Sequence, residues 1–217
     1  MTMRNICGID VDVQKKDIKN LHIRVKEGPR VIVSVPKRCS DERIVSLIEK
    51  KKDWILAAMQ RNHLSKTELS DNCEIELIGR KFTVHMTHGN RESVKIIDNE
   101  IFIVSSDSDE DLLLRKVHRT VLESILPGIF GRLQSTSGLS CSSWYLRYMT
   151  SRWGTCNTRT KRICLSTNLA KRPIECIEYV VMHELVHTVV PNHGQNFKIL
   201  LTNNMPDWKE RKKLLNS

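Results

Sequence analysis

Three residues near the C-terminus have the types and spacing of a hydrolytic metal site. In the run V-M-H-E-L-V-H, His183 and His187 are four residues apart, and Glu184 follows the first of them. Positions i and i+4 of a helix share one face, so both imidazoles can reach one metal ion. The carboxylate beside them can then act on a water bound to that metal. The alternative is an ordinary helix with two histidines and a surface glutamate between them.

His193, six residues after His187, is the best candidate for a third ligand. The spacing equals that of the longer H-E-x-x-H-x-x-G-x-x-H signature, although Val190 stands where that signature has glycine. Three protein ligands and one open position characterise a catalytic zinc site. Zinc lowers the pKa of a bound water from about 16 toward about 7, and Glu184 is then the predicted general base. Asp207 is the competing candidate for the third position.

The composition limits the classes of protein to which the chain can belong. Its 217 residues are 40% hydrophobic and 28% charged, which indicates a folded globular protein, and no apolar run is long enough to span a membrane. The seven cysteines include no C-x-x-C pair, and the first residues do not form a secretory signal. Reduced thiols and a cytoplasmic location are therefore predicted. No G-K-[ST] sequence follows Gly131 or Gly138, so a phosphate-binding loop is not expected.

The formal net charge of +10 raises the question of an acidic partner. Nucleic acid, anionic lipid or an acidic substrate would each fit such a balance. However, the lysines and arginines are spread along the whole chain. Each of their dense clusters has a single tryptophan nearby, which is less than a base-stacking surface needs. A basic solvated surface is the simpler interpretation, and association with nucleic acid is the alternative.

The pattern of apolar and turn-forming residues predicts an α+β protein. Residues 1–105 are expected to form a β-rich N-terminal subdomain, and residues 106–217 a mainly helical subdomain that carries the candidate site. Alternating apolar residues and turn signals in the first part predict short strands at 21–25, 31–35, 74–78, 81–88, 93–97 and 101–104.

Other stretches of the N-terminal part are less regular. Residues 1–20 show little pattern and are expected to be partly loose, and the polar composition of residues 62–70 suggests a connector. Between the predicted hairpin and this connector, the apolar spacing predicts one helix from about Ser40 to about Gln60.

The C-terminal part begins with a long helical pattern that opens at the acidic cluster 107–111. Pro127 is expected to bend or break that helix. Short strands are predicted at 144–148 and 163–165. Pro173 is well placed as the first residue of the helix that carries the candidate ligands.

Arg152 lies in the turn-like segment 151–156, between the two predicted strands. It is a candidate for stabilising the oxyanion that forms on a substrate, and a packing role or a structural ion pair is the alternative. Cys164 and Cys176, near the same motifs, are expected to be small apolar fillers.

Several stretches of the C-terminal half share a known pattern. They are S-R-W-G-T-C at 151–156, L-S-T-N-L at 165–169, Y-V-V-M-H-E-L-V-H at 179–187, and N-H-G at 192–194 followed by Phe197. Together they resemble the YgjP-like metallopeptidase family, which is similar to SprT-like and other zincin peptidases. The resemblance implies a zincin-like catalytic part, zinc held by His183, His187 and His193, and Glu184 as the catalytic residue.

The sequence therefore predicts a zinc-dependent metallopeptidase that acts on a peptide or protein. Zinc would polarise the carbonyl, and Glu184 would activate the water. Two other functions stay open at this stage. One is hydrolysis of a nucleotide phosphoanhydride at the same metal, which the basic charge would suit. The other is a non-enzymatic module that binds zinc and nucleic acid, for which a closed four-ligand site would be evidence.

Overall fold

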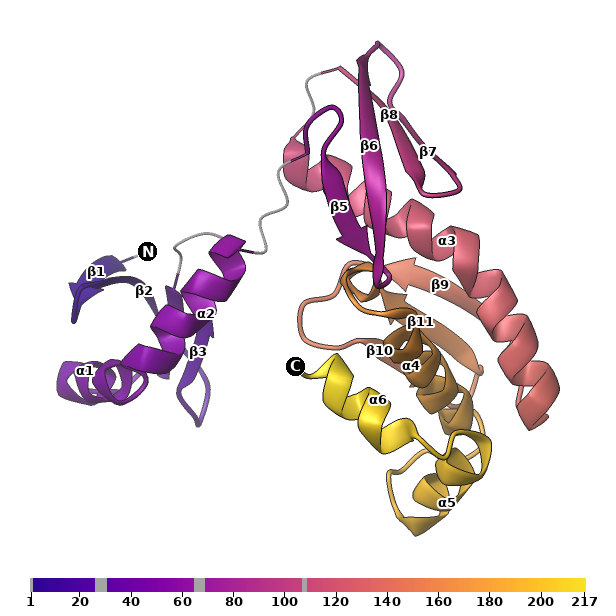
Figure 1. The fold of residues 1–217 in the computed structure, drawn as a ribbon. Coiled ribbons are helices and arrows are strands. Elements are labelled where there is room, and N and C mark those ends of the chain that lie inside the picture. The colour runs from indigo at the N-terminus through magenta and orange to yellow at the C-terminus, as the bar shows by residue number, and fades with distance from the viewer. Residues whose placement is uncertain (1, 26–30, 65–68, 107–108) are drawn as a thin grey trace. The chain divides into compact units, whose positions relative to one another are not determined.

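The chain divides into two compact units, residues 1–68 and residues 69–217, each of which is described by itself. Figure 1 shows both units as ribbons. The computed structural model describes residues 2–25, 31–64, 69–106 and 109–217.

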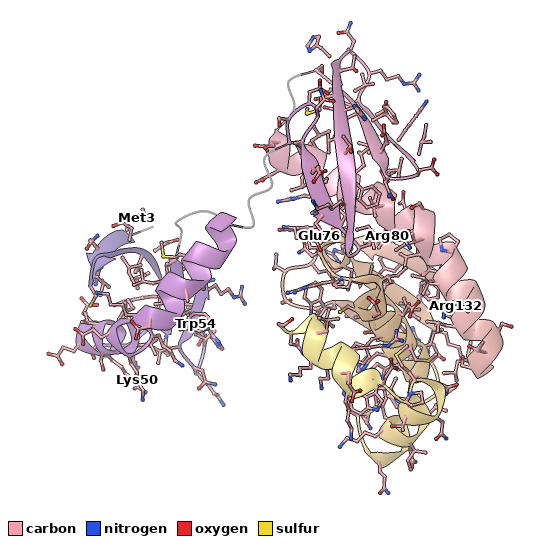
Figure 2. All side chains as sticks on the ribbon, viewed as in Figure 1. Met3, Lys50, Trp54, Glu76, Arg80 and Arg132 are labelled. Carbon is pink, nitrogen blue, oxygen red and sulfur yellow. The ribbon has the colours of Figure 1, made fainter. Side chains whose placement is uncertain are left out.

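The first unit is a four-stranded mixed sheet with two helices on one face. Its strands follow the order β1-β2-β4-β3, with β2 and β4 parallel and the two outer pairs antiparallel. Alternate valines of the central strands are buried with Ile44, Ile48 and Ile55 of the helices. Lys50 and Trp54 are exposed on those helices (Figure 2). The elements are β1 (Thr2–Ile6), β2 (Ile9–Lys16), β3 (His22–Val25), β4 (Val31–Pro36), α1 (Asp41–Lys50) and α2 (Lys52–Leu64).

Two parts of this unit differ from what the sequence pattern predicted. Residues 1–20, expected to be partly loose, mostly form β1 and β2, because β2 pairs with β4, a strand distant in sequence that local pattern does not reveal. The single helix expected to end near Gln60 is two helices, since Lys51 leaves helical geometry with φ −109° and ψ 8°. The predicted hairpin is confirmed as the antiparallel pair β3–β4. Of the expected connector, residues 65–68 lie outside the described residues.

The second unit begins with a four-stranded sheet in the order β5-β6-β8-β7, and its strands have nearly the predicted bounds. A long helix, α3, packs its buried residues against this sheet. The Asp109 side chain accepts a hydrogen bond from the backbone N of Asp111 at 3.0 Å and so caps the first turn. The elements are β5 (Glu74–Leu77), β6 (Arg80–His88), β7 (Ser93–Ile97), β8 (Glu100–Ser105) and α3 (Glu110–Ser137).

Helix α3 continues through Pro127, where a break was one of the expected outcomes. Proline removes one helical hydrogen bond. The buried side chains Leu122 and Leu126 before it and Ile129 and Phe130 after it belong to one core, so both halves of the helix pack against the same residues.

The rest of the second unit is a small sheet followed by helices (Figure 1). Strand β11 pairs in parallel with β9 and antiparallel with β10, which is an edge strand where the sequence suggested a turn. The elements are β9 (Ser143–Arg147), β10 (Gly154–Asn157), β11 (Arg162–Ser166), the short 3-10 helix η1 (Thr167–Lys171), α4 (Ile174–His187), α5 (Gln195–Asn204) and α6 (Trp208–Leu215).

Both sheets of the second unit share one core with α3 and α4. The β5–β6 turn is fixed to this core, because the backbone N of Ile78 donates to the carbonyl of Ala170 at 2.7 Å. Gly79, at φ +73°, packs against Pro173 so closely that a Cβ would lie 3.2 Å from the proline Cα. The division expected after residue 105 therefore falls inside a compact unit, and the break between the units follows Glu68.

The α+β class is confirmed. Across the ranges that the structure describes, no helix combines the length and hydrophobicity needed to cross a membrane. All seven cysteines are free thiols.

Candidate metal centre

Helix α4 carries the first two candidate ligands on one face. Another face of the helix is apolar and buried, with Ile177, Val181 and Leu185 fully inaccessible. These residues recur at the helical spacing, so burying them fixes the rotation of the helix and the direction of its histidines. His187 is the last residue of the helix.

The Nε2 atoms of three histidines converge. His193 Nε2 lies 2.9 Å from His183 Nε2 and 3.1 Å from His187 Nε2. The ligand atoms of all three lie within 4.8 Å of one another. His193 follows the turn after α4, immediately before α5. The turn after α4 has Val190 at the position of the usual glycine, and it still places the His193 imidazole beside the other two.

Hydrogen bonding sets the lone pair of His187 toward this cluster. Its Nδ1 lies 3.0 Å from the carbonyl oxygen of Val190, and a carbonyl only accepts, so Nδ1 carries the proton. Nε2 of the neutral ring then carries the free lone pair. This tautomer is the one that binds a metal through Nε2. Val190, which breaks the longer signature, thus supplies the group that orients His187.

The donor set fits a divalent metal. His193 Nε2 carries at most one proton, so it cannot donate to both neighbouring nitrogens, whereas one metal ion accepts all three lone pairs. At Zn–N distances of about 2.0–2.1 Å, tetrahedral ligands are about 3.3–3.4 Å apart. The observed separations of 2.9 and 3.1 Å lie within about half an ångström of this value. Nδ1 of His183 is buried and has no hydrogen-bond partner among the described residues, unlike Nδ1 of His187.

Phe197 of α5 supports all three imidazoles. Its ring centroid lies 4.8 Å from that of His183 and 4.7 Å from those of His187 and His193. Phe197 is itself 3% exposed, so the core fixes its position. One buried aromatic ring therefore limits the movement of the whole ligand set.

Burial keeps two of the imidazoles neutral. It lowers the pKa of His183 to about 3, with smaller contributions from the charges of His187, His193 and Lys212. The pKa of His187 is also lowered, chiefly by burial. Neutral imidazole is the form that binds metals, so both rings are ready to bind at neutral pH.

Glu184 is a buried carboxyl. It is 5% exposed, and burial raises its pKa to about 8. No described residue donates a hydrogen bond to its carboxylate. A carboxyl whose pKa lies near neutrality can both take and return a proton.

Gly154 of β10 lies directly against Glu184. A Cβ at this position would be 2.7 Å from Glu184 Oε1 and 2.9 Å from its Cγ. The strand backbone can approach the carboxylate this closely only because residue 154 has no side chain. In the sequence, Gly154 is part of the S-R-W-G-T-C stretch, and no role was predicted for it. A glycine inside a short strand is a known sign of close backbone approach, and that signal could have identified it.

The other candidates from the sequence have the following positions. Arg152 is exposed and lies two residues before Gly154, the first residue of β10. Asp207 accepts from Arg211 Nε at 2.8 Å, so its carboxylate is engaged away from the cluster. Cys164 and Cys176 are buried, as expected of apolar fillers. Burial, followed by the charges of Glu184 and Cys141, raises the pKa of Cys156 to about 11, which keeps that thiol protonated.

A fold with three converging imidazoles on and after an apolar helix, with a buried carboxyl beside them, defines a metallopeptidase-like centre. A family model described as the YgjP-like metallopeptidase domain matches residues 19–217, and the chain belongs to this family. Among solved structures, the chain is similar to the metallopeptidase zymogen of Methanocaldococcus jannaschii jannalysin, at 20% identity and a TM-score of 0.36. That match covers 41% of this chain and 90% of jannalysin. A comparison with curated proteins finds no significant match.

Proposed function

We propose that this metallopeptidase is a zinc enzyme that hydrolyses peptide bonds with Glu184 as its general base. The observation that carries the proposal is the convergence of three Nε2 atoms at 2.9 and 3.1 Å beside one buried carboxyl. His183, His187 and His193 would hold the metal. Zinc is the metal of choice because it accepts three neutral imidazoles and leaves a position open for water.

When bound, zinc supplies an acidified water and a polarised carbonyl. The chain's own residues then handle the proton. The Glu184 carboxylate takes the proton of the attacking water and passes it to the leaving amine. Its pKa near 8 in the metal-free chain would fall beside a dication, since an opposite charge favours the ionised form. Because residue 154 has no side chain, the Glu184 carboxylate can pack directly against the backbone of β10.

Metal removal and replacement tests the proposal. Full-length chain is treated with a chelator, reloaded with one equivalent of zinc, and assayed on unstructured casein-like peptides and on nucleoside triphosphates. We expect peptide cleavage only with metal present and no release of phosphate. Phosphate release without peptide cleavage would overturn the proposal in favour of nucleotide hydrolysis.

A further inference from the structure

Charge is distributed unevenly in the second unit. From β9 to the C-terminus, residues 143–217, there are twelve Lys and Arg against five Asp and Glu. In the sheet that precedes it, residues 74–105, the corresponding numbers are four and five. The elements that build the metal centre therefore carry an excess of seven positive charges, whereas the preceding sheet has one more acidic than basic residue.

Most of the acidic groups in residues 143–217 are not available to neutralise this charge. Glu184 is buried in the site. Glu178 pairs with Arg132 and with Arg211, and Asp207 pairs with Arg211 as well. Residues 143–217 therefore carry a net positive charge, and a surface of one sign attracts partners of the other.

Two lysines of α6 lie close to the ring of one tryptophan. The Nζ atoms of Lys209 and Lys212 lie 5.9 and 6.0 Å from the centroid of the Trp208 ring. Trp208 is half-buried, and its Nε1 donates to Thr202 Oγ1 of α5 at 2.9 Å, which holds the indole still. Among the ion pairs of the described residues, neither lysine has a carboxylate partner. Two unpaired ammonium groups thus share one anchored ring.

Helix α6 packs on α4, the helix that carries two of the candidate ligands. Arg211 Nη1 donates to Glu178 Oε2 of α4 at 2.6 Å, five residues before His183. The helix that holds the Trp208 indole, α5, is also the one that places Phe197 under the three imidazoles.

We infer that Lys209, Lys212 and Trp208 form a subsite that binds a carboxylate of the peptide substrate, so that this enzyme prefers acidic peptides. The inference rests on the proposed peptidase function. Lysine ammonium groups have three donors each and bind carboxylates as compact charges. The carboxylate comes from an Asp or Glu side chain or from the peptide's own C-terminus.

Nucleic acid is the competing polyanion, and the aromatic groups argue against it. Single strands bind where bases stack on open aromatic faces. The Trp208 ring is approached by two lysines, and the Tyr145 ring has the Arg162 guanidinium at 5.4 Å from its centroid. Peptide carboxylates need no such stacking surface.

The test compares peptides that differ in one carboxylate. A quenched peptide is made with Asp or Asn at each position near the cleavage point, and with a free or an amidated C-terminus. We expect the zinc-loaded chain to cleave the acidic member of a pair roughly three- to thirtyfold more efficiently in kcat/KM, mostly through KM. The pair that shows the difference identifies which carboxylate is bound.

Charge variants assign the effect to the cluster. K209E/K212E should abolish or reverse the preference, and K209R/K212R should keep it. R91E/K95E, which makes the same change in net charge on the β5–β8 sheet segment, is the control and should leave the preference intact. Equal cleavage of both members of every pair, or a preference unchanged in K209E/K212E, would overturn the subsite.

A binding measurement separates this failure from failure of the peptidase function. Affinity of acidic and neutral peptides for the metal-free chain is measured by fluorescence anisotropy, in competition with a single-stranded oligonucleotide. If the chain cleaves nothing but K209E/K212E loses the tighter binding of acidic peptide, the subsite stands without the enzyme. Tight binding of the oligonucleotide with no discrimination between the peptides would overturn the subsite in favour of nucleic acid.

Discussion

The polar groups on two sides of helix α4 differ in whether they have hydrogen-bond or ion-pair partners. On one side Glu178, 16% exposed at its side chain, has both carboxylate oxygens paired, one with Arg132 of α3 and one with Arg211 of α6. Figure 2 shows Arg132 on its long helix. On the other side Glu184 is buried at 5% exposure without a hydrogen-bond donor among the described residues, and Nδ1 of His183 has no partner.

The paired groups on helix α4 stabilise the fold, and the unpaired groups on the same helix belong to the candidate metal centre. A buried polar group without a partner destabilises the fold, and native proteins keep few of them. Groups whose partners are satisfied hold helices together. Groups left unsatisfied beside three converging imidazoles are free to bind a ligand and to move a proton. Substitutions on the unpaired side should therefore change activity, and substitutions on the paired side should change the free energy of unfolding.

The largest effect is expected from Glu184→Gln. The amide has the same shape but cannot accept the proton, so kcat should fall by roughly 10²–10⁴ while zinc stays bound. Turnover on a casein-like peptide and zinc content by mass spectrometry are the two measurements. Full activity in this variant would remove Glu184 from the base role.

A smaller loss of activity is expected from Gly154→Ala. The new Cβ would lie 2.7 Å from Glu184 Oε1, so the carboxylate must move, and kcat should fall roughly 10- to 100-fold with zinc affinity unchanged. Gly128→Ala on α3, where no atom lies within 4 Å of the added Cβ, is the matched control. An unchanged kcat for Gly154→Ala would show that the close approach does not position the carboxylate.

A double variant tests the same contact without relying on activity. Glu184→Asp shortens the side chain and makes room at residue 154. The destabilisation caused by Gly154→Ala should therefore be smaller in the Glu184→Asp background, measured as free energy of unfolding in urea. Strictly additive effects would mean that the two residues do not press on each other.

The unsatisfied side should also give the metal-free chain a characteristic pH dependence. Glu184 has a raised pKa, so its contribution to stability is complete below pH 4.5 and is lost as the pH rises through about 8. His183 and His187 have lowered pKa values and act in the opposite direction, with their contribution present above pH 6.5 and lost as the pH falls. Between pH 6.5 and 8 the slope belongs mainly to Glu184, and the free energy of unfolding should decrease by about 2 kcal/mol.

Urea unfolding of metal-free wild type and Glu184→Gln at pH 6.5 and pH 8 measures this slope. The variant has no titrating carboxyl at residue 184 and should lose most of the decrease. The same decrease in both proteins would assign the slope to other groups.

Substitution of the ion-paired Glu178 should change the free energy of unfolding and leave kcat unchanged. Glu178→Ala breaks two partly buried ion pairs and should lower the free energy of unfolding by roughly 1–2 kcal/mol, with kcat unchanged. Glu123→Ala, which breaks the exposed pair with Arg119 within α3, is the control and should cost about 0.3–0.5 kcal/mol. A large loss of kcat in Glu178→Ala would erase the distinction between the two sides.

Local pattern predicted the parts of the molecule whose signals are local. The i, i+4 spacing placed His183 and His187 on one helix face, and alternating residues gave the β3–β4 hairpin and the strands of the second sheet. His193 was placed on ligand type and spacing, and the structure brings its ring to the other two.

What the sequence did not reveal depends on contacts between distant segments. Strand β2 exists because it pairs with β4, and its own residues do not show that partner. Gly154 matters only once β10 lies against α4. Lys212 gains its position from the packing of α6 on α4, because nothing in a basic run distinguishes one lysine from the next.

Coordination of the bound ion is the most direct test of the metal centre. X-ray absorption at the zinc edge of the loaded full-length chain should show three imidazole nitrogens at about 2.0–2.1 Å and one oxygen from water. His193→Ala should lose one of the three nitrogens. A fourth protein ligand, or fewer than three imidazoles in the wild-type chain, would contradict an open catalytic site.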